Sequence, residues 1–352
     1  MRQERRLACH CDMVTQQRDH ATRPPLTDTL REAAFLQDSP GRTGYPIATL
    51  ASGGTAMTEG RPSPRPVRRR WLRLAARVAH LAISQPRRTA DLVQASYDTV
   101  APGYDAAWTD HMRGLSLEML DRLAVPSGAE CLDLACGTGF LTEELARRSG
   151  RRAVGVDASA GMLAVARRER GGAADFVQAD APEYLASRSA ASTDVVTCGW
   201  GLGYMRPWRL VRRAAGALAP GGRLGIIDNS LFSLAEVIGC SIRAFAERPE
   251  ALEHVMKVRF LPAPWVLAAM MRAAGLRVLA SWGGEKTYHV PTGRAAVERL
   301  TATGAAAGFE FASAPAARDE VFTRFAEIIE TRRTGLGIPI THRYLAAIGE
   351  KP

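Results

Sequence analysis

Three aspartates at the ends of apolar segments have the type and spacing that could do chemistry in this chain. Asp133 precedes a turn that contains Gly137 and Gly139. Asp157 lies 24 positions after Asp133, and Asp180 ends a third apolar segment. A carboxylate about 20 residues beyond a glycine turn suits a ribose, because it can accept hydrogen bonds from two hydroxyl groups. These residues therefore predict a site for a ligand that contains a ribose.

The elements that must position these acids are strands of a parallel sheet. The apolar run Cys131–Ala135 fits a buried strand, and Phe140–Arg147 has the periodicity of a helix. Such a unit brings backbone N–H groups and a helix N-terminus close to a ligand, with glycine where a Cβ would block the approach. Further strands are expected at Arg152–Ser159, Asp175–Ala179 and Thr193–Cys198. Because the carboxyl ends of parallel strands form the ligand crevice, the three acids should meet there.

The rest of the chain continues this alternation of strands and helices. The further elements that we expect are helices at His111–Leu123, Leu210–Leu218 and Arg318–Arg332, helical stretches near Leu234–Glu247 and Pro264–Ala274, and strands at Leu224–Asp228, Gly275–Val290 and Ile338–Gly349. The pattern predicts an α/β fold with a doubly wound, mostly parallel, Rossmann-like sheet of seven strands. Residues 229–271 interrupt the alternation and are expected to form a helical cap above the crevice.

Four ordered motifs resemble those of the class I S-adenosylmethionine-dependent methyltransferases. They are LDLACGTG (Leu132–Gly139), similar to motif I, VGVDAS (Val154–Ser159), similar to the ribose-binding motif, QADA (Gln178–Ala181), similar to the adenine-binding motif, and LAPGGRLGIID (Leu218–Asp228), similar to the helix-turn-strand that follows the substrate-side loop. One departure is Ala135, where many members carry glycine. The exchange of one small residue for another should tighten the approach of the cofactor only slightly.

The resemblance implies S-adenosylmethionine as the cofactor and an antiparallel last strand. The backbone of motif I would hold the methionine part, Asp157 the ribose hydroxyls and Asp180 the adenine amino group. Asp133 would organise the turn and the amino group of the cofactor. The cofactor-binding residues that follow from the resemblance are Tyr104, Asp133, Ala135, Gly137, Gly139, Asp157, Ala158, Asp180, Ala181 and Cys198.

Two aromatic segments are expected at the mouth of the crevice. The repeated Tyr-Asp pair of Tyr97–Asp105 (YDTVAPGYD) resembles the opening segment of many small-molecule methyltransferases, including quinone C-methylating and phospholipid N-methylating types, in which it closes over the cofactor. The alternative is a surface turn whose tyrosines only pack. The loop Trp200–Trp208 is rich in glycine and aromatic residues, which suits a planar or apolar acceptor as well as ordinary packing.

The reaction that the resemblance implies is an in-line displacement of a methyl group from a sulfonium to a small-molecule acceptor. A lipid, a quinone or a secondary metabolite would serve, and O-, N- and C-methylation stay open. A base is needed only if the acceptor must lose a proton. The candidates are His289, His111, Tyr104 and Tyr204, none of which the sequence singles out.

Two other function classes share parts of this pattern. An NAD(P)-dependent oxidoreductase would use the same strand, glycine turn and acid, but its third glycine is missing because Thr142 stands at that offset. A non-catalytic protein could keep the cofactor pocket as a binding module. Binding of S-adenosylhomocysteine or of NAD would separate the two enzyme classes.

Charge and composition divide the 352 residues into three parts. Residues 1–90 hold 16 Arg against 7 Asp and Glu, which is nearly all of the net charge of +10, so the rest gives no sign of nucleic-acid binding. We expect a disordered extension at 1–64, a basic amphipathic helix at 65–88 and a methyltransferase domain at 89–352. Cys9, Cys11 and His20 in the extension lack the second ligand pair of a metal site, so no metal is expected.

The amphipathic helix and the cysteines bear on where the protein works. Leu74, Val78 and Leu81 share one face of the helix, and arginines occupy the other. A helix of this kind either lies weakly on a membrane surface or packs its apolar face on the catalytic domain, and packing is the commoner use. The six cysteines form no disulfide framework, which favours a reducing, cytoplasmic setting. The oligomeric state is left open.

Overall fold

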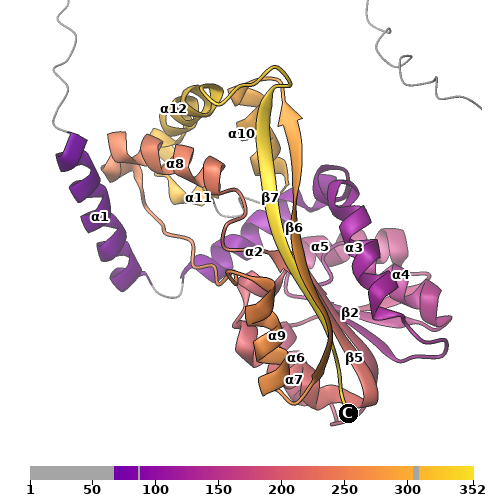
Figure 1. Cartoon of the computed structure of the whole chain (residues 1–352). Coiled ribbons are helices and arrows are strands. Elements are labelled where there is room, and N and C mark those ends of the chain that lie inside the picture. The colour runs from indigo at the N-terminus through magenta and orange to yellow at the C-terminus, as the bar shows by residue number, and fades with distance from the viewer. Residues whose placement is uncertain (1–66, 86–87, 304–308) are drawn as a thin grey trace, which may run out of the picture. The chain divides into compact units, whose positions relative to one another are not determined.

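The computed structural model describes residues 67–85, 88–303 and 309–352. The extension expected at 1–64, together with Cys9, Cys11 and His20, lies outside the described residues. Most of the expected helix at 65–88 is present as α1 (Val67–Ser84). Figure 1 shows the arrangement of the described elements.

A seven-stranded sheet in the order β3-β2-β1-β4-β5-β7-β6 forms the centre of the fold. β7 runs antiparallel to both β5 and β6, whereas β1 to β5 pair in parallel. The strands are β1 (Cys131–Leu134), β2 (Ala153–Asp157), β3 (Ala174–Gln178), β4 (Thr193–Gly199), β5 (Leu218–Asn229), β6 (Arg277–Val290) and β7 (Ile338–Glu350). The predicted Rossmann-like sheet with an antiparallel last strand is therefore confirmed.

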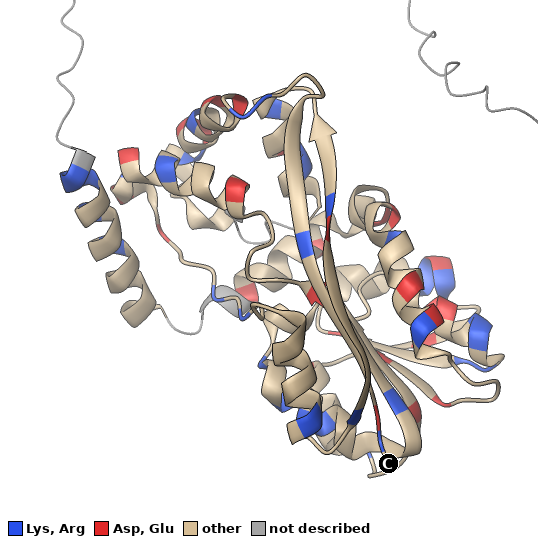
Figure 2. Ribbon diagram, in the orientation of Figure 1, with Lys and Arg blue, Asp and Glu red and all other residues tan. Residues whose placement is uncertain are grey.

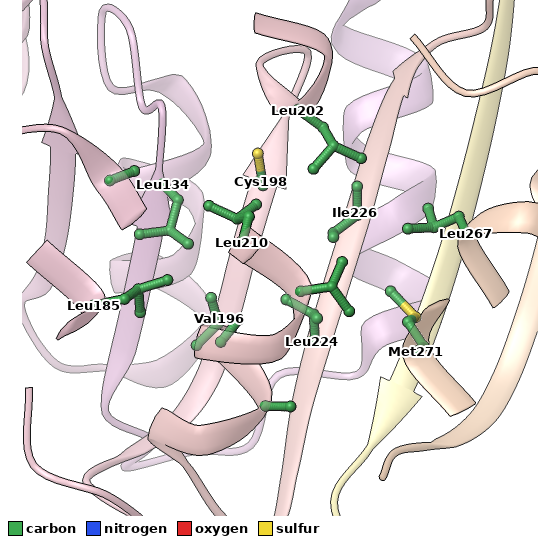
Figure 3. Close-up of a cluster of buried hydrophobic side chains, with 14 of the residues drawn as sticks. Leu134, Leu185, Val196, Cys198, Leu202, Leu210, Leu224, Ile226, Leu267 and Met271 are labelled. Carbon is green, nitrogen blue, oxygen red and sulfur yellow. The ribbon is translucent and has the colours of Figure 1, made fainter. Parts of the chain in front are cut away.

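Helices cover both faces of the sheet, as a doubly wound fold requires. One apolar cluster joins β1, β4 and β5 to the helices of one face, and Figure 3 shows Leu134, Val196 and Ile226 gathered there with Leu210 and Leu267. These helices are α6 (Ala181–Ser187), α7 (Pro207–Ala217) and α9 (Pro264–Ala273). The opposite face carries α3 (Asp110–Leu123), α4 (Phe140–Ser149) and α5 (Ala160–Arg170). The central strands are buried on both faces, which explains their continuous apolar sequences.

The helical layer beyond the sheet differs from the predicted cap. Of the helices in residues 229–271, α8 (Ala235–Glu247) belongs to it, but α9 packs on the sheet beside α7 as a regular crossover helix. The other members come from the connection between β6 and β7 and are α10 (Gly293–Ala302), α11 (Phe309–Ala312) and α12 (Arg318–Glu330). Their shared apolar cluster includes the ends of β6 and β7, which run on past the sheet (Figure 1). We call α8 and α10–α12 the cap.

α1 packs against the cap. Leu74 and Leu81 are buried in the apolar cluster of the cap, and Arg77 Nε donates a hydrogen bond of 2.8 Å to the carbonyl of Leu252. Trp71 and Leu72 stay exposed. The apolar face of this helix is thus used largely for packing. Figure 2 shows basic and acidic residues interspersed over most of the described helices, whereas α1 carries basic residues and no acidic one.

Candidate active site

A cavity of about 720 Å³ opens at the carboxyl ends of β1 to β4. The ends of these strands form one wall, and α2 (Arg88–Val100) with the segment that follows it forms another. The predicted site residues that line the cavity are Tyr104, Ala135, Gly137, Asp157, Ala158, Asp180, Ala181 and Tyr204. The structure thus brings together residues from five separate segments, as expected for the crevice of an open parallel sheet.

Asp157, at the end of β2, links two turns at the base of the cavity. Its Oδ2 accepts a hydrogen bond of 2.8 Å from the N–H of Gly137, and its Oδ1 accepts one of 2.8 Å from the N–H of Ser159. Burial raises the pKa of this carboxyl, and the backbone N–H groups of Ser159 and Gly137 offset part of that rise. Each carboxylate oxygen has a second lone pair. Asp157 can therefore hold the turns and still accept hydroxyl donors from a ligand.

Asp133 stands behind the turn and does not line the large cavity. Only 1% of it is exposed, and its two oxygens accept hydrogen bonds from the hydroxyls of Thr197 (2.7 Å) and Thr142 (2.8 Å). Burial raises the pKa of its carboxyl to about 7. Asp133 borders a hollow of about 50 Å³ beneath the turn. It can thus support the turn from below.

The turn after β1 explains why two of the predicted residues occur where they do. Gly139 precedes α4 with φ +90°, and a Cβ there would lie 2.7 Å from the ring of Phe176, so glycine is required. Ala135 has φ 54°, in the left-handed region where a non-glycine residue is uncommon. A Cβ on Gly201 would lie 2.5 Å from the Cβ of Ala135. The alanine thus fits because its neighbour across the crevice is glycine. Gly139 itself does not line the cavity.

Two other predicted positions have different environments. Cys198 is completely buried in the core and does not line the cavity; burial raises the pKa of its thiol far above the ordinary value. Asp180 lines the cavity and begins α6, where its Oδ1 accepts a hydrogen bond of 3.0 Å from the N–H of Glu183.

Residues 88–109, which we call the lid, comprise α2, η1 (Ala101–Gly103) and the π-helical turn η2 (Asp105–Thr109). In each of the two Tyr-Asp pairs the tyrosine and the aspartate have different contacts. Tyr97 and Tyr104 line the cavity, whereas Asp98 and Asp105 form hydrogen bonds that attach the lid to the sheet layer.

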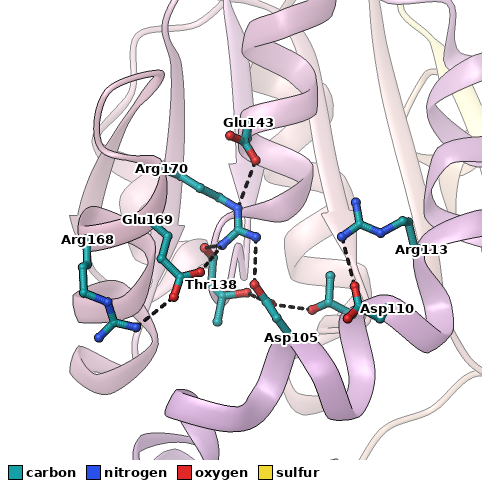
Figure 4. Close-up of polar contacts among 9 residues, drawn as sticks. Asp105, Asp110, Arg113, Thr138, Glu143, Arg168, Glu169 and Arg170 are labelled. Atoms are coloured by element: carbon teal, nitrogen blue, oxygen red, sulfur yellow. Dashed lines mark hydrogen bonds and ion pairs between the residues drawn. The ribbon is translucent and has the colours of Figure 1, made fainter.

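The two attachments are built from short polar contacts. Asp98 accepts hydrogen bonds from the Ser159 hydroxyl (2.5 Å) and the Gly161 N–H (2.8 Å). Asp105 accepts one of 2.5 Å from the Thr138 hydroxyl and pairs with Arg170 at 2.7 Å, as Figure 4 shows. Thr138 belongs to the turn after β1, so the lid is fixed directly to that turn.

Three tyrosines meet where the lid approaches the loop after β4. The ring of Tyr97 lies 6.0 Å from that of Tyr104 and 5.7 Å from that of Tyr204. The hydroxyl groups of Tyr97 and Tyr204 are hydrogen-bonded to each other. Burial raises the pKa of all three, that of Tyr204 to about 12. These phenols are therefore protonated at neutral pH, which suits them to hydrogen bonding and packing better than to accepting a proton.

The histidines proposed as bases lie away from the cavity. His289 is exposed on β6. The ring of His111 packs edge-on against Tyr288 at 4.8 Å, next to His342 of β7. Burial lowers the pKa of His111 to about 4 and that of His342 to about 3. Both imidazoles are therefore neutral at pH 7 and pack in an aromatic cluster.

Comparisons with known proteins agree with this geometry. A family profile described as "Methyltransferase domain" matches residues 131–222. The 2-phytyl-1,4-naphtoquinone methyltransferase of Thermosynechococcus vestitus is 38% identical over 148 residues, which are 39% of this chain and 64% of that protein. The ubiquinone biosynthesis O-methyltransferase of Xanthomonas axonopodis pv. citri is 34% identical over 46% of this chain and 68% of its own length. That of Ralstonia nicotianae is 33% identical over 53% of this chain and 78% of its own length.

The chain belongs to the class I S-adenosylmethionine-dependent methyltransferases. The match covers slightly less than two thirds of the Thermosynechococcus protein. Membership of this family confirms the predicted enzyme class and its cofactor, S-adenosylmethionine. It also sets aside the oxidoreductase alternative.

The site of this methyltransferase fits S-adenosylmethionine. Gly137 has φ +56°, and no atom lies within 4 Å of the place that a Cβ would take, so the turn leaves open space beside its backbone. Asp157 and Asp180 present carboxylates at the ends of adjacent strands. The cavity volume of about 720 Å³ lies within the usual range of about 300–1,000 Å³ for cofactor sites.

The methyltransferase site also contains residues that the sequence analysis missed. Asp91 and Gln94 line the cavity from the same face of α2 as Tyr97. Gln94 Nε2 donates a hydrogen bond of 3.1 Å to the carbonyl of Ala158. Asp91, Gln94 and Tyr97 follow one another at intervals of three residues, and this helical spacing was a signal that could have found the first two. Lys257 and Arg259 also line the cavity but belong to no motif.

Proposed function

We propose that this protein transfers a methyl group from S-adenosylmethionine to a small-molecule acceptor, a lipid, a quinone or a secondary metabolite. The observation that carries the proposal is the cavity enclosed by Asp157 and Asp180 on the sheet side and by the tyrosines of the lid on the other. One of the three relatives is named a 2-phytyl-1,4-naphtoquinone methyltransferase and two are named ubiquinone biosynthesis O-methyltransferases, and these names support the quinone among the three acceptors.

In this proposal each wall of the cavity holds one part of the cofactor. Asp157 accepts hydrogen bonds from the ribose hydroxyls, and Asp180 lies beside the adenine, with Ala158 and Ala181 as neighbours. The backbone of Ala135 and Gly137 faces the methionine part. Asp133 and Gly139 act through the shape of the turn, because neither lines the cavity.

The bound cofactor supplies an electrophilic methyl group on a sulfonium. The contribution of the chain is to align the acceptor with that methyl group and to exclude water. Tyr97, Tyr104 and Tyr204 suit this role, since they are partly buried, neutral and hydrogen-bonded to one another or packed together. The proposal assigns no catalytic base to His111 or His289, which do not line the cavity.

The proposed setting is the cytoplasm. Cys131, Cys136, Cys198 and Cys240 are free thiols, which suits a reducing compartment. Among the helices that the structure describes, none combines the length and the apolar character needed to traverse a bilayer. The exposed Trp71, Leu72 and Ile83 of α1 would allow weak contact with a membrane surface.

Calorimetric titration of the full chain with S-adenosylhomocysteine and, separately, with NAD tests the cofactor assignment. We expect binding of the former and none of the latter; NAD binding without a response to S-adenosylhomocysteine would refute the proposal. A screen of cell extract with methyl-labelled S-adenosylmethionine tests catalysis. Labelled product that depends on the enzyme is expected, and cofactor binding without any product would support the binding-module alternative instead.

A further inference from the structure

A second cavity, of about 240 Å³, adjoins the cavity of about 720 Å³, which we call the cofactor cavity. The second cavity is lined mainly by apolar side chains, with Asn229, Ser233, Ser241 and Thr301 among them. It lies between the cap and the segment Glu253–Ala263, which links η4 (Pro249–Ala251) to α9. The side chains that make its apolar wall are Leu231, Leu234, Val237, Ile238, Met256, Val258, Phe260, Val297, Leu300 and Phe325. Tyr204 lines both cavities, so the two meet at this residue.

The extended segment between the cavities presents alternate side chains to each of them. Met256, Val258 and Phe260 line the apolar cavity, whereas Lys257 and Arg259 line the cofactor cavity. Successive side chains of an extended backbone point to opposite sides, which accounts for the division. One strip of chain thus gives an apolar wall to one cavity and a cationic wall to the other.

The segment is held tightly against the loop after β4. The N–H of Arg259 donates a hydrogen bond of 2.6 Å to the carbonyl of Gly203, and the ring of Phe260 lies 5.8 Å from that of Tyr204. A Cβ on Gly203 would lie 2.1 Å from the Phe260 ring, so only glycine permits this approach. The junction of the two cavities is therefore a defined part of the fold.

The mouth of the apolar cavity is itself apolar. Leu231, Ile238 and Val258 line it and remain 53%, 47% and 40% exposed. Phe232, next to Leu231, is exposed as well. Solvent-exposed apolar side chains around a cavity are typical of a binding site for an apolar ligand.

The two cations on the other side of the segment have no carboxylate partner among the residues that the structure describes. Neither Lys257 nor Arg259 forms an ion pair with a described residue, and the Arg259 guanidinium donates one long hydrogen bond of 3.4 Å to the carbonyl of Met205. Most other arginines around the sheet are paired, for example Arg170 with Asp105. Two unpaired cations at the edge of a cavity suit an anionic group of a ligand.

We propose that the methyl acceptor is an amphipathic acid whose apolar chain fills the 240 Å³ cavity and whose anionic group faces Lys257 and Arg259. The acceptor then crosses from one cavity to the other beside Tyr204, where it reaches the cofactor cavity. This inference rests on the proposed function, because it names the acceptor class of the same site.

The test uses 11-(dansylamino)undecanoate, a fluorescent acid with an apolar chain, and the full chain saturated with S-adenosylhomocysteine. We expect saturable binding that decanoate displaces about fivefold more effectively than decanol, since each exposed ion pair adds only a modest energy. Val258→Trp should weaken probe binding about tenfold by filling the cavity. Ile242→Trp is the matched control, because Ile242 is 42% exposed on α8 but does not line the cavity.

A second comparison tests the cations. Lys257→Gln combined with Arg259→Gln should remove the preference for decanoate over decanol, whereas Arg272→Gln on α9 should preserve it. Equal competition by decanoate and decanol in the wild type, or Val258→Trp binding the probe as tightly as Ile242→Trp, would overturn the inference. Weaker S-adenosylhomocysteine binding in the Lys257/Arg259 variant would also overturn it, because the cations would then serve the cofactor. Failure of the wild type to bind S-adenosylhomocysteine at all would instead contradict the proposed function.

Discussion

Replacing Asp105 by alanine should detach the lid from the turn after β1. The carboxylate accepts hydrogen bonds from the hydroxyls of Thr138 (2.5 Å) and Thr109 (2.7 Å) and pairs with Arg170 at 2.7 Å. Burial tends to raise the pKa of Asp105, but the contacts from Thr138, Thr109 and Arg170 outweigh it, so the pKa is lowered overall. The charged form is thus the one that the folded state stabilises.

The size of the effect follows from the exposure of the ion pair. Side-chain exposure is 10% for Arg170 and 25% for Asp105. Removing one partner of a fully buried pair costs about 3–5 kcal/mol. Because Asp105 is partly exposed and Glu143 and Glu169 still face Arg170, we expect a loss of about 2 kcal/mol.

Asp110→Ala is the matched control, five residues further along and visible in Figure 4. Its ion pair with Arg113 measures 3.0 Å, and the two side chains are 59% and 45% exposed. Such a pair contributes less than about 0.5 kcal/mol. The two variants therefore remove the same group from the same region, and only one of them breaks the attachment.

Urea denaturation, calorimetric titration with S-adenosylhomocysteine and amide hydrogen exchange measure the consequences. Asp105→Ala should speed exchange in residues 91–109 and weaken cofactor affinity about tenfold or more, since binding must then order the lid. The reasoning is refuted if both alanine variants have the same stability and the same affinity. Loss of stability with unchanged affinity would show that the lid does not contribute to cofactor binding.

Three further predictions follow from the same geometry. Asp157→Ala should weaken S-adenosylhomocysteine binding by about 1–3 kcal/mol in calorimetry, whereas Asp175→Ala, which removes an exposed carboxylate of β3, should not; equal affinities would contradict the ribose assignment. His342 has a pKa of about 3 in the folded state and about 6.5 in the unfolded chain, so between these values only the unfolded chain binds the proton. The wild type should therefore lose about 2 kcal/mol more unfolding free energy than His342→Phe when the pH falls from 8 to 5. Parallel stability profiles of the two proteins would count against this. Gly139→Ala should lower the unfolding free energy by about 2–3 kcal/mol, because the methyl group would meet Phe176 at a positive φ; wild-type stability would contradict the assigned backbone.

The parts of the site that the sequence predicted are those that short-range patterns determine. Gly137 and Gly139 mark a turn, and Asp157 and Asp180 follow apolar strands, so their meeting at one edge follows from the parallel sheet alone. The repeated Tyr-Asp pair likewise lies at the cavity, where Tyr97 and Tyr104 line it, and its closing over a cofactor stays a prediction. Local pattern and final position agree at these residues.

The parts that the sequence did not predict depend on contacts between distant segments. Helical stretches near 234–247 and 264–274 interrupt the alternation of strands and helices, which predicts a cap at 229–271, but the apolar Leu267 and Met271 of α9 pack against the sheet. Lys257 and Arg259 lie in an extended stretch with no motif, so the sequence gives no sign that they line a cavity. Their contact with the ligand site is visible only once the fold places this stretch between two cavities. His342 reads as an ordinary strand residue until β7 brings it beside His111.

The continuation of β6 and β7 beyond the sheet affects how related enzymes with this fold could differ in the acceptor that they bind. The pairing Val290–Ile338 at the far end and Arg277–Glu350 at the near end belong to one ladder, and α10 to α12 are inserted between its strands. The inserted helices can therefore vary in sequence and length while the ladder and the strand ends that face the donor keep their register. In the proposed function the strand ends hold the cofactor, whereas α10 and α12 contribute Val297, Leu300 and Phe325 to the cavity proposed for the acceptor.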